Sequence, residues 1–226
     1  MVMEYSEILD KVEDALEGEA HLDELSRMRQ DPFKILISTI LSARTKDANT
    51  REATEKLFAK FNTPKKIAET NVEILEQLIY KSGFYKVKAA RIKEVSQVLL
   101  DKYNGKVPDN FNELVSLPGV GAKTANCVLV YAYKIPAIPV DTHVHRISNR
   151  IGWIKTKNPE ETENALKDLI PKNQWIRLNR IFVKFGQEIC LPINPKHEIC
   201  PIEDICLKDF SMELALKKKK HINRVK

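Results

Sequence analysis

Apolar residues recur at helical spacing through almost the whole chain. Tyr5, Ile8, Leu9 and Val12 follow one another three or four residues apart, which predicts an opening amphipathic helix. Asp31-Pro32 places a capping carboxylate before a proline, a pair typical of a helix start. The same pattern predicts further helices: over residues 33–40 and 47–61, a short one from 64, one that Asn71 can cap and that runs to 79, and others over 86–103, 111–116, 121–133, from about 141, from 159, and over 175–190.

Strand signals are missing from the pattern. No pair of alternating apolar segments is joined by a hairpin turn, and only residues 137–140 look extended. The sequence therefore predicts an all-α fold of about ten helices. Because no Gly/Ser-rich linker divides the chain, any second domain must itself be built from packed helices.

Composition narrows the class of protein. The hydrophobic share of 43% is large enough for a core, which excludes wholesale disorder. No apolar run approaches the roughly 18 residues of a membrane span, and the acidic, periodic start is unlike a signal peptide. Three of the four cysteines fall within the last 40 residues, unlike a disulfide framework, so we expect an intracellular location and no membrane partner.

Charge is segregated along the chain. Residues 1–33 hold ten acids against three bases, whereas residues 81–106 hold seven bases against two acids. Residues 217–226 carry six positive charges and no negative one, and we expect this tail to be disordered. A basic face indicates a polyanionic partner, since neutralised phosphates release counterions. A solvated helix face remains an alternative explanation for residues 81–106.

A glycine-containing turn, LPGVGAKT, lies between two predicted helices at residues 117–124. Pro118-Gly119 favours a tight turn, and Gly121 allows a close approach of backbone to a ligand. The helix that follows presents unpaired amides and a positive dipole end, which together can bind phosphate. A plain interhelical turn would also use these glycines.

The segments LPGVGAKTAN and PVDTHVHRISNRIGW together resemble the helix-hairpin-helix base-excision glycosylase superfamily, and more closely its endonuclease III branch. The resemblance runs from about residue 26 to residue 210 and includes ILSARTKD, SGFYKVKA and the C-terminal cysteines. It implies two helical domains flanking a cleft that holds the active site. The expected limits are residues 26–135 for a six-helix domain, and residues 1–25 with 136–216 for a second domain carrying a metal loop.

The resemblance places the family's lysine on Lys123 and its aspartate on Asp141. An uncharged amine can attack C1′ of a damaged nucleotide and form a Schiff base, after which β-elimination cuts the strand. A carboxylate nearby stabilises positive charge on the sugar in a dry site. A helix N-terminus and burial would lower the pKa of the lysine. Taken singly, Lys123 could be a solvated lysine, and Asp141 could be a helix cap.

DNA handling follows from the same resemblance. The residue that fills the gap left by an extruded base falls on Arg44, where the family often has glutamine, and a second wedge falls on Phe84. Phe84 could instead be a core residue. Lys86, Lys88 and Arg91 suit phosphates, and the hairpin residues Gly119, Val120 and Gly121 are expected to bind DNA through their backbone. His143 and His145 are expected to orient helices or contact DNA rather than perform chemistry, and the resemblance places Asp47 on an acidic position of the site region whose role is undefined.

The C-terminal segment CLPINPKHEICPIEDIC keeps the family's ligand spacing, C-x6-C-x2-C-x5-C, but has histidine in second place. The ligand set is Cys190, His197, Cys200 and Cys206. The resemblance implies a [4Fe–4S] cluster, which imidazole can also ligate. A tetrahedral zinc ion in the same Cys3His set, or no metal at all, remains open.

The sequence therefore predicts a DNA glycosylase with AP lyase activity on duplex DNA, acting on oxidised pyrimidines or abasic sites, as a monomer. One rival is a monofunctional glycosylase for T or U opposite G, which would lack the Schiff-base amine. The other is a non-catalytic DNA-binding module, which would need neither Lys123 nor Asp141.

Overall fold

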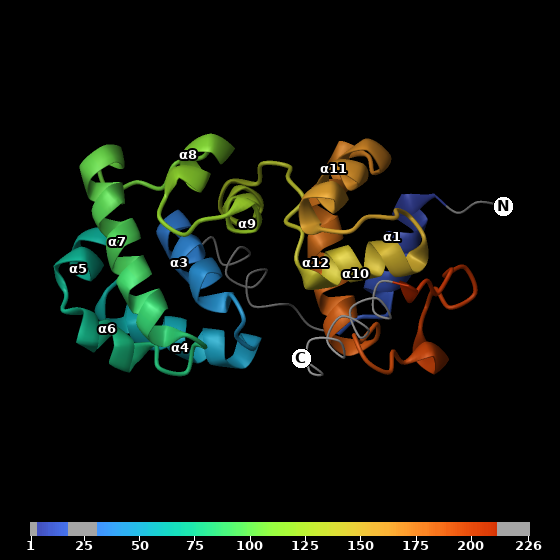
Figure 1. Ribbon diagram of the computed structural model, residues 1–226, viewed down its shortest axis with the longest axis horizontal. Helices are drawn as coiled ribbons and strands as arrows, with labels where there is room; N and C mark the ends of the chain where they lie inside the picture. The colour runs from blue at the N-terminus through green and yellow to red at the C-terminus, as the bar shows by residue number, and fades with distance from the viewer. Residues whose placement is uncertain (1–3, 18–30, 212–226) are drawn as a thin grey trace, which may run out of the picture. The chain divides into compact units, whose positions relative to one another are not determined.

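The computed structural model describes residues 4–17 and 31–211, which fall into two compact units (Figure 1). One unit consists of Glu19–Pro139, and the other combines Met1–Gly18 with Val140–Lys226. The domain limits expected from the sequence, at residues 25/26 and 135/136, stay a prediction. The basic tail at 217–226 lies outside the described residues.

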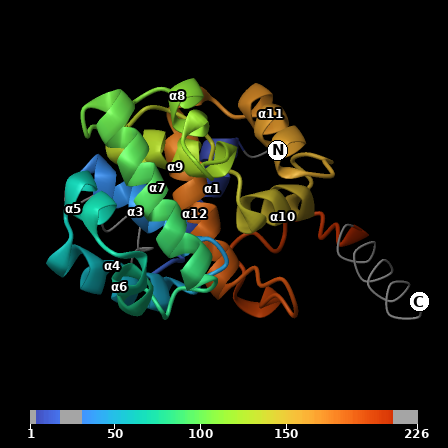
Figure 2. The same ribbon diagram turned by 60° about the vertical axis from the view of Figure 1, so that its left-hand side comes forward.

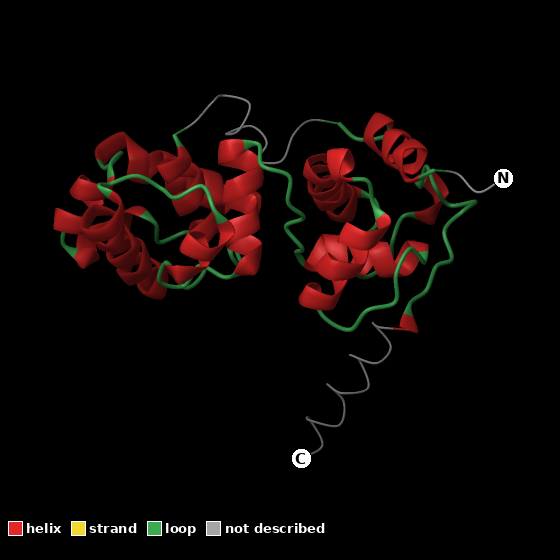
Figure 3. Ribbon diagram, turned by 90° about the horizontal axis from the view of Figure 1, so that it is seen from above, coloured by secondary structure: helices red, strands yellow, loops and turns green. Residues whose placement is uncertain are grey.

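The all-α fold is confirmed, since Figure 3 shows helices and loops but no strand in the described part of the chain. The unit formed by residues 19–139 contains seven described helices: α3 (Pro32–Ser42), α4 (Asp47–Lys60), α5 (Pro64–Glu69), α6 (Val72–Leu78), α7 (Tyr85–Tyr103), α8 (Phe111–Ser116) and α9 (Ala122–Tyr133). The other unit contains α1 (Tyr5–Asp14), α10 (Thr142–Ile151), α11 (Pro159–Leu169), α12 (Trp175–Glu188) and two short 3₁₀ turns, η1 (Lys172–Gln174) and η2 (His197–Ile199).

Local capping chemistry explains most helix starts. Asp31 accepts a hydrogen bond from the Phe33 amide at 2.7 Å, and Pro32 occupies the first turn of α3. Asn158 caps α11 through the Glu161 amide in the same way. Asn71 is the N-cap residue of α6, as expected, but its side chain makes no capping hydrogen bond.

The core of the 19–139 unit forms around α3. Its residues from Ile35 to Leu41 are all buried, as expected for a helix that is apolar on every side. It packs against α9, α4 and α7, and Figure 2 shows α7 crossing it. Helix α7 in turn contacts α5 and α6. Cys127, in α9, is buried here as expected.

The core of the other unit forms around α12, which packs against α10 and α1. The Trp153 ring lies between Tyr5 and Phe182, with its centroid 5.3 Å from each neighbouring ring. Arg177 of α12 pairs with Asp10 and Glu13 of α1, so opposite charges reinforce this apolar contact.

No helix among the described residues combines the length and apolar character that crossing a membrane requires.

Candidate functional site

The hairpin between α8 and α9 is a tight turn with two uncommitted amides. The Val120 amide donates to Leu117 O at 3.1 Å, and the Val120 side chain is buried. Gly119 has a φ of +66°, a left-handed conformation that favours glycine. Within the described residues, the amides of Gly119 and Gly121 make no hydrogen bond. Val120 thus holds the turn, and two glycine amides remain for a ligand.

Arg91 of α7 lies directly against this hairpin. A methyl group placed on Gly119 would overlap the Arg91 guanidinium, whereas one on Gly121 would meet open space. Arg91 is half-buried, and its guanidinium makes no hydrogen bond or ion pair with the described part of the chain. The hairpin therefore presents two free amides and one uncommitted cation, a combination suited to a phosphate.

Lys123 is the second residue of α9 and follows the hairpin directly. It is half-buried, whereas Gly121 and Ala122 before it are exposed. Its amine is therefore attached within two residues of the free glycine amides, at the positive end of the helix dipole.

Asp141 is the N-cap of α10. Its Oδ1 accepts hydrogen bonds from the amides of His143 and Val144, both at 2.8 Å. Its other oxygen, Oδ2, makes no hydrogen bond to the described residues. Asp141 thus has a structural role that fixes its orientation, and one carboxylate oxygen that this role does not use. Lys123 and Asp141 belong to different units.

The two histidines after Asp141 help hold its unit together. His145 Nδ1 lies 2.6 Å from Thr162 Oγ1 of α11, and His143 Nδ1 lies 3.1 Å from the Arg146 guanidinium.

The two predicted wedges lie on neighbouring turns of the 19–139 unit. Arg44 and Phe84 are both exposed and both adopt left-handed backbone conformations, with φ of 52° and 59°. The Arg44 guanidinium lies 5.8 Å from the centre of the Phe84 ring, within cation–π range. Phe84 is 63% exposed, so its alternative as a core residue is excluded. Lys86, in the next helical turn, is also exposed.

The phosphate-binding role expected for Lys88 is wrong. This lysine is only 6% exposed, and its ammonium donates to Leu41 O, Ala43 O, Thr45 Oγ1 and Ser82 Oγ at 2.7–2.9 Å. A fully engaged, buried ammonium cannot reach a DNA backbone. The basic pattern of residues 81–106 gave no sign of this, because the four acceptors come from other segments of the chain.

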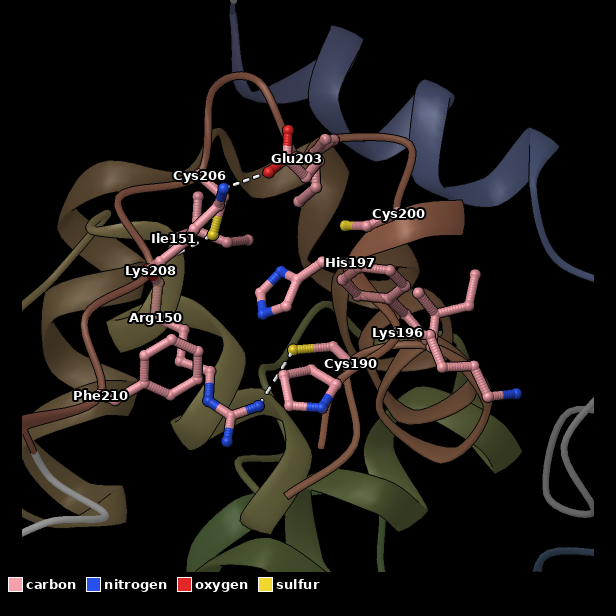
Figure 4. Close-up of a pocket in the computed structure, with 14 residues that line it drawn as sticks. Arg150, Ile151, Cys190, Lys196, His197, Cys200, Glu203, Cys206, Lys208 and Phe210 are labelled. Carbon is pink, nitrogen blue, oxygen red and sulfur yellow. Dashed lines mark hydrogen bonds and ion pairs between the residues drawn. The ribbon is translucent and has the colours of Figure 1, made fainter. Parts of the chain in front are cut away.

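The four predicted metal ligands line one pocket in the unit that contains α10 and α12. Figure 4 shows the His197 ring and the sulfurs of Cys190, Cys200 and Cys206 directed toward a common hollow. Burial raises the pKa values of Cys200 and Cys206, so these thiols stay protonated until a metal displaces the protons.

Arg150, in the last turn of α10, lines the same pocket, and the sequence did not single it out. It is buried at 3% exposure and donates to Cys190 Sγ at 3.4 Å, Leu191 O at 2.6 Å and Pro192 O at 3.0 Å. The Phe210 ring covers its guanidinium at 4.8 Å. No local sequence signal marked Arg150, because the carbonyls that it binds lie about 40 residues further along the chain.

The donor set and its spacing favour a cluster over a single metal ion. Across residues 4–17 and 31–211, no three His, Cys, Asp or Glu side chains gather closely enough to hold a single metal ion. Ligands around a multi-iron cluster stand farther apart than those around one ion, so three thiols and an imidazole on a mainly apolar pocket suit a cluster.

Two family models match the chain. Residues 37–172 match the HhH-GPD superfamily base excision DNA repair protein, and residues 190–206 match the iron–sulfur binding domain of endonuclease III. The second match covers all four predicted ligands. The chain therefore carries a [4Fe–4S] cluster, and zinc or an empty site is not favoured.

Known proteins agree with this assignment. Endonuclease III of Thermotoga maritima is 54% identical over 176 residues, covering 78% of this chain and 83% of the relative. A trapped endonuclease III–DNA covalent intermediate is 35% identical, with a TM-score of 0.76 and coverage of 92% and 97%. A thermostable thymine-DNA glycosylase is 27% identical, with a TM-score of 0.78 and coverage of 89% and 92%. By fold, family models and sequence, this chain belongs to the endonuclease III family of base excision DNA repair proteins.

Proposed function

We propose that this chain, a DNA glycosylase with AP lyase activity, removes oxidised pyrimidines from duplex DNA through Lys123 and Asp141. The observation that carries the proposal is the position of Lys123, within two residues of free hairpin amides in a family that processes damaged DNA. A phosphate held by those amides would bring the sugar of the damaged nucleotide to the amine.

The chemistry assigned to Lys123 is attack of its neutral amine on C1′. The C1′–N bond breaks, the base leaves with its electron pair and takes up a proton, and the sugar ring opens to a Schiff base. Loss of a C2′ proton then expels the 3′ phosphate by β-elimination, and water releases the lysine. The free Oδ2 of Asp141 is assigned the stabilisation of positive charge at C1′ during the first step.

The DNA contacts assigned to this chain come from the 19–139 unit. Gly119, Gly121 and Arg91 bind a backbone phosphate at the hairpin, and Lys86 binds another. Arg44 fills the gap left by the extruded base, and Phe84 stacks between neighbouring bases. Their exposure and the 5.8 Å Arg44–Phe84 contact support these roles.

The iron–sulfur loop is assigned a structural role, with Cys190, His197, Cys200 and Cys206 as ligands. When bound, the cluster supplies a fixed crosslink between the end of α12 and residues 200–206. Arg150 orients the first ligand through its hydrogen bond to Cys190 Sγ.

Binding of DNA follows from the family, whereas the form of the DNA, the oligomeric state, the location and the domain limits are proposed here. We assign the chain to double-stranded DNA containing a damaged base or an abasic site, as a monomer, in an intracellular location. The domain limits are those expected from the sequence.

A monofunctional glycosylase for mismatched T or U is the rival that the fold alone does not separate. The thymine-DNA glycosylase has a TM-score as high as that of the covalent endonuclease III complex. Lys123 separates the two activities, because a monofunctional enzyme activates water and needs no amine at this position.

Borohydride trapping tests the proposal. Wild-type protein incubated with abasic or oxidised duplex and borohydride should give a stable protein–DNA adduct, and Lys123→Ala should give none. Lys134→Ala is the matched control, since it removes a lysine from the other end of the same helix and should trap normally. Base removal by the wild-type protein without an adduct would identify a monofunctional enzyme, and binding without base removal would identify a DNA-binding module.

A further inference from the structure

Lys88 joins two exposed turns that are 37 residues apart in sequence. The Arg44 loop (residues 43–46) follows α3, and the Phe84 turn (residues 82–84) precedes α7. The Lys88 ammonium donates to Ala43 O at 2.7 Å and Thr45 Oγ1 at 2.8 Å in the first turn, and to Ser82 Oγ at 2.9 Å in the second. One buried cation thus bridges both segments.

The two turns also contact each other directly. The Gly83 amide donates to Thr45 Oγ1 at 3.0 Å, and a methyl group on Gly83 would come within 2.9 Å of Arg44 O. Any substituent there would push the turns apart. The contact therefore depends on the glycine and on a Thr45 hydroxyl that Lys88 orients.

The ammonium also stabilises the end of α3. Besides Ala43 O, it reaches Leu41 O at 2.8 Å, so it caps carbonyls at the negative end of that helix dipole. An ammonium has three protons, and here it faces four neutral oxygens, so every donor is used. Burial lowers the pKa of Lys88 to about 8. The four hydrogen bonds offset this cost of burying the ammonium.

The two turns that Lys88 connects each contain a residue with a strained backbone. Arg44 and Phe84 have left-handed backbones, a conformation that non-glycine residues adopt only when their surroundings fix it. Both side chains are exposed, and neither side chain explains its own backbone conformation. The hydrogen bonds of Lys88 to the residues before and after Arg44 supply that constraint at Arg44, and its hydrogen bond to Ser82 Oγ holds the Phe84 turn two residues before Phe84.

We propose that Lys88 is a positioning residue that fixes the Arg44 loop and the Phe84 turn in one arrangement, so that both wedges enter a damaged duplex together. The inference rests on the proposed roles of Arg44 and Phe84 in opening the duplex. Prior fixation removes the entropy cost of ordering two loops at the moment of base extrusion. Lys88 itself touches neither DNA nor the reacting sugar.

The test compares duplex with single-stranded substrate. Lys88→Met keeps the length of the side chain and removes its donors. A single-stranded abasic oligonucleotide has no stacked base to extrude, so its cleavage reports Lys123 chemistry alone. We expect Lys88→Met to lower the single-turnover rate on an oxidised duplex at least tenfold and to change the single-stranded rate less than twofold.

Lys93→Met is the matched control. Lys93 lies on the same helix, and its ammonium also donates to two carbonyls, one of them Thr70 O at 2.6 Å, but these belong to α5 and its C-terminal end. The Lys93→Met variant should leave the ratio of the duplex rate to the single-stranded rate unchanged. An unchanged ratio in Lys88→Met, or an equal fall in Lys93→Met, would overturn the proposal.

Amide hydrogen exchange provides a readout that is independent of catalysis. Lys88→Met should speed exchange at residues 43–46 and 82–84 of the free protein, and Lys93→Met should not. If Lys88→Met does not fold, Thr45→Val removes one of the four hydrogen-bond acceptors of Lys88 with little change in volume. This variant should show the lower duplex rate and the faster exchange more weakly. Failure of the wild-type protein to cleave either substrate would refute the proposed function, whereas unchanged exchange at both turns would refute the role of Lys88.

Discussion

Removal of the Arg91 side chain should weaken DNA binding by one phosphate contact. The guanidinium lies against Gly119 and has no partner among the described residues, so Arg91→Ala breaks no internal ion pair. Each phosphate contact on duplex DNA contributes about −0.9 to the slope of log K against log salt. The slope should therefore become less steep by about one unit, equally for damaged and undamaged duplexes.

The size of this effect follows from the slope. When salt rises from about 50 to 200 mM, loss of one phosphate contact accounts for about a 3.5-fold change in affinity. The ratio of wild-type to Arg91→Ala affinity should therefore be about 3.5-fold smaller at the higher salt concentration. Fluorescence anisotropy over a salt series measures it. Lys65→Ala is the control, since it removes one charge from an exposed side chain of α5 and should leave the slope unchanged. Parallel salt curves for wild type and Arg91→Ala would refute the assignment of Arg91 to a phosphate.

Variants at three further positions separate structural from chemical roles. Asp141→Asn keeps a capping side chain, so thermal stability should change little while base removal falls by about 10²-fold. Asp141→Ala should also lose about 1 kcal/mol of stability, because the cap is gone. Unimpaired base removal by Asp141→Asn would exclude a chemical role for Asp141. His197→Cys should keep its iron and visible absorbance, and its cluster should have a lower reduction potential than that of the wild type. His197→Ala should lose iron. Equal reduction potentials in wild type and His197→Cys would show that His197 is not a ligand. Burial lowers the pKa of Lys88 to about 8 from its ordinary 10.5, so the unfolded chain binds more protons between these pH values and stability rises with pH there. Wild type should gain about 2 kcal/mol over Lys88→Met between pH 7 and 9.5 in urea unfolding, and a constant difference would contradict the shift.

The helices were predictable because their signals are local. Asp31-Pro32 and Asn158-Pro159 mark two starts, and Asn104 and Gly105, both with positive φ, end α7 as expected. The hairpin and the ligand spacing were visible for the same reason, since each lies within a short stretch of sequence. Asn71 marks the start of α6 but makes no capping hydrogen bond, because a residue suited to capping need not direct its side chain to the helix.

Burial of charged residues was not predictable in this way. Lys88 appeared as one base among seven in the basic segment 81–106, but its acceptors come from residues 41–45 and 82, which only the fold brings near. Arg91 reaches Gly119 for the same reason. Arg150 depends on carbonyls about 40 residues further along the chain. Periodicity gives the side of a helix on which a residue lies, but not which neighbour meets it there.

Identification of the residue that bonds to DNA tests the central claim most directly. Wild-type protein trapped with borohydride on an abasic duplex should be digested, and the modified peptide sequenced by mass spectrometry. We expect one modified residue, Lys123, carrying the reduced sugar fragment. Attachment to a different lysine, or to the N-terminal amine, would contradict it.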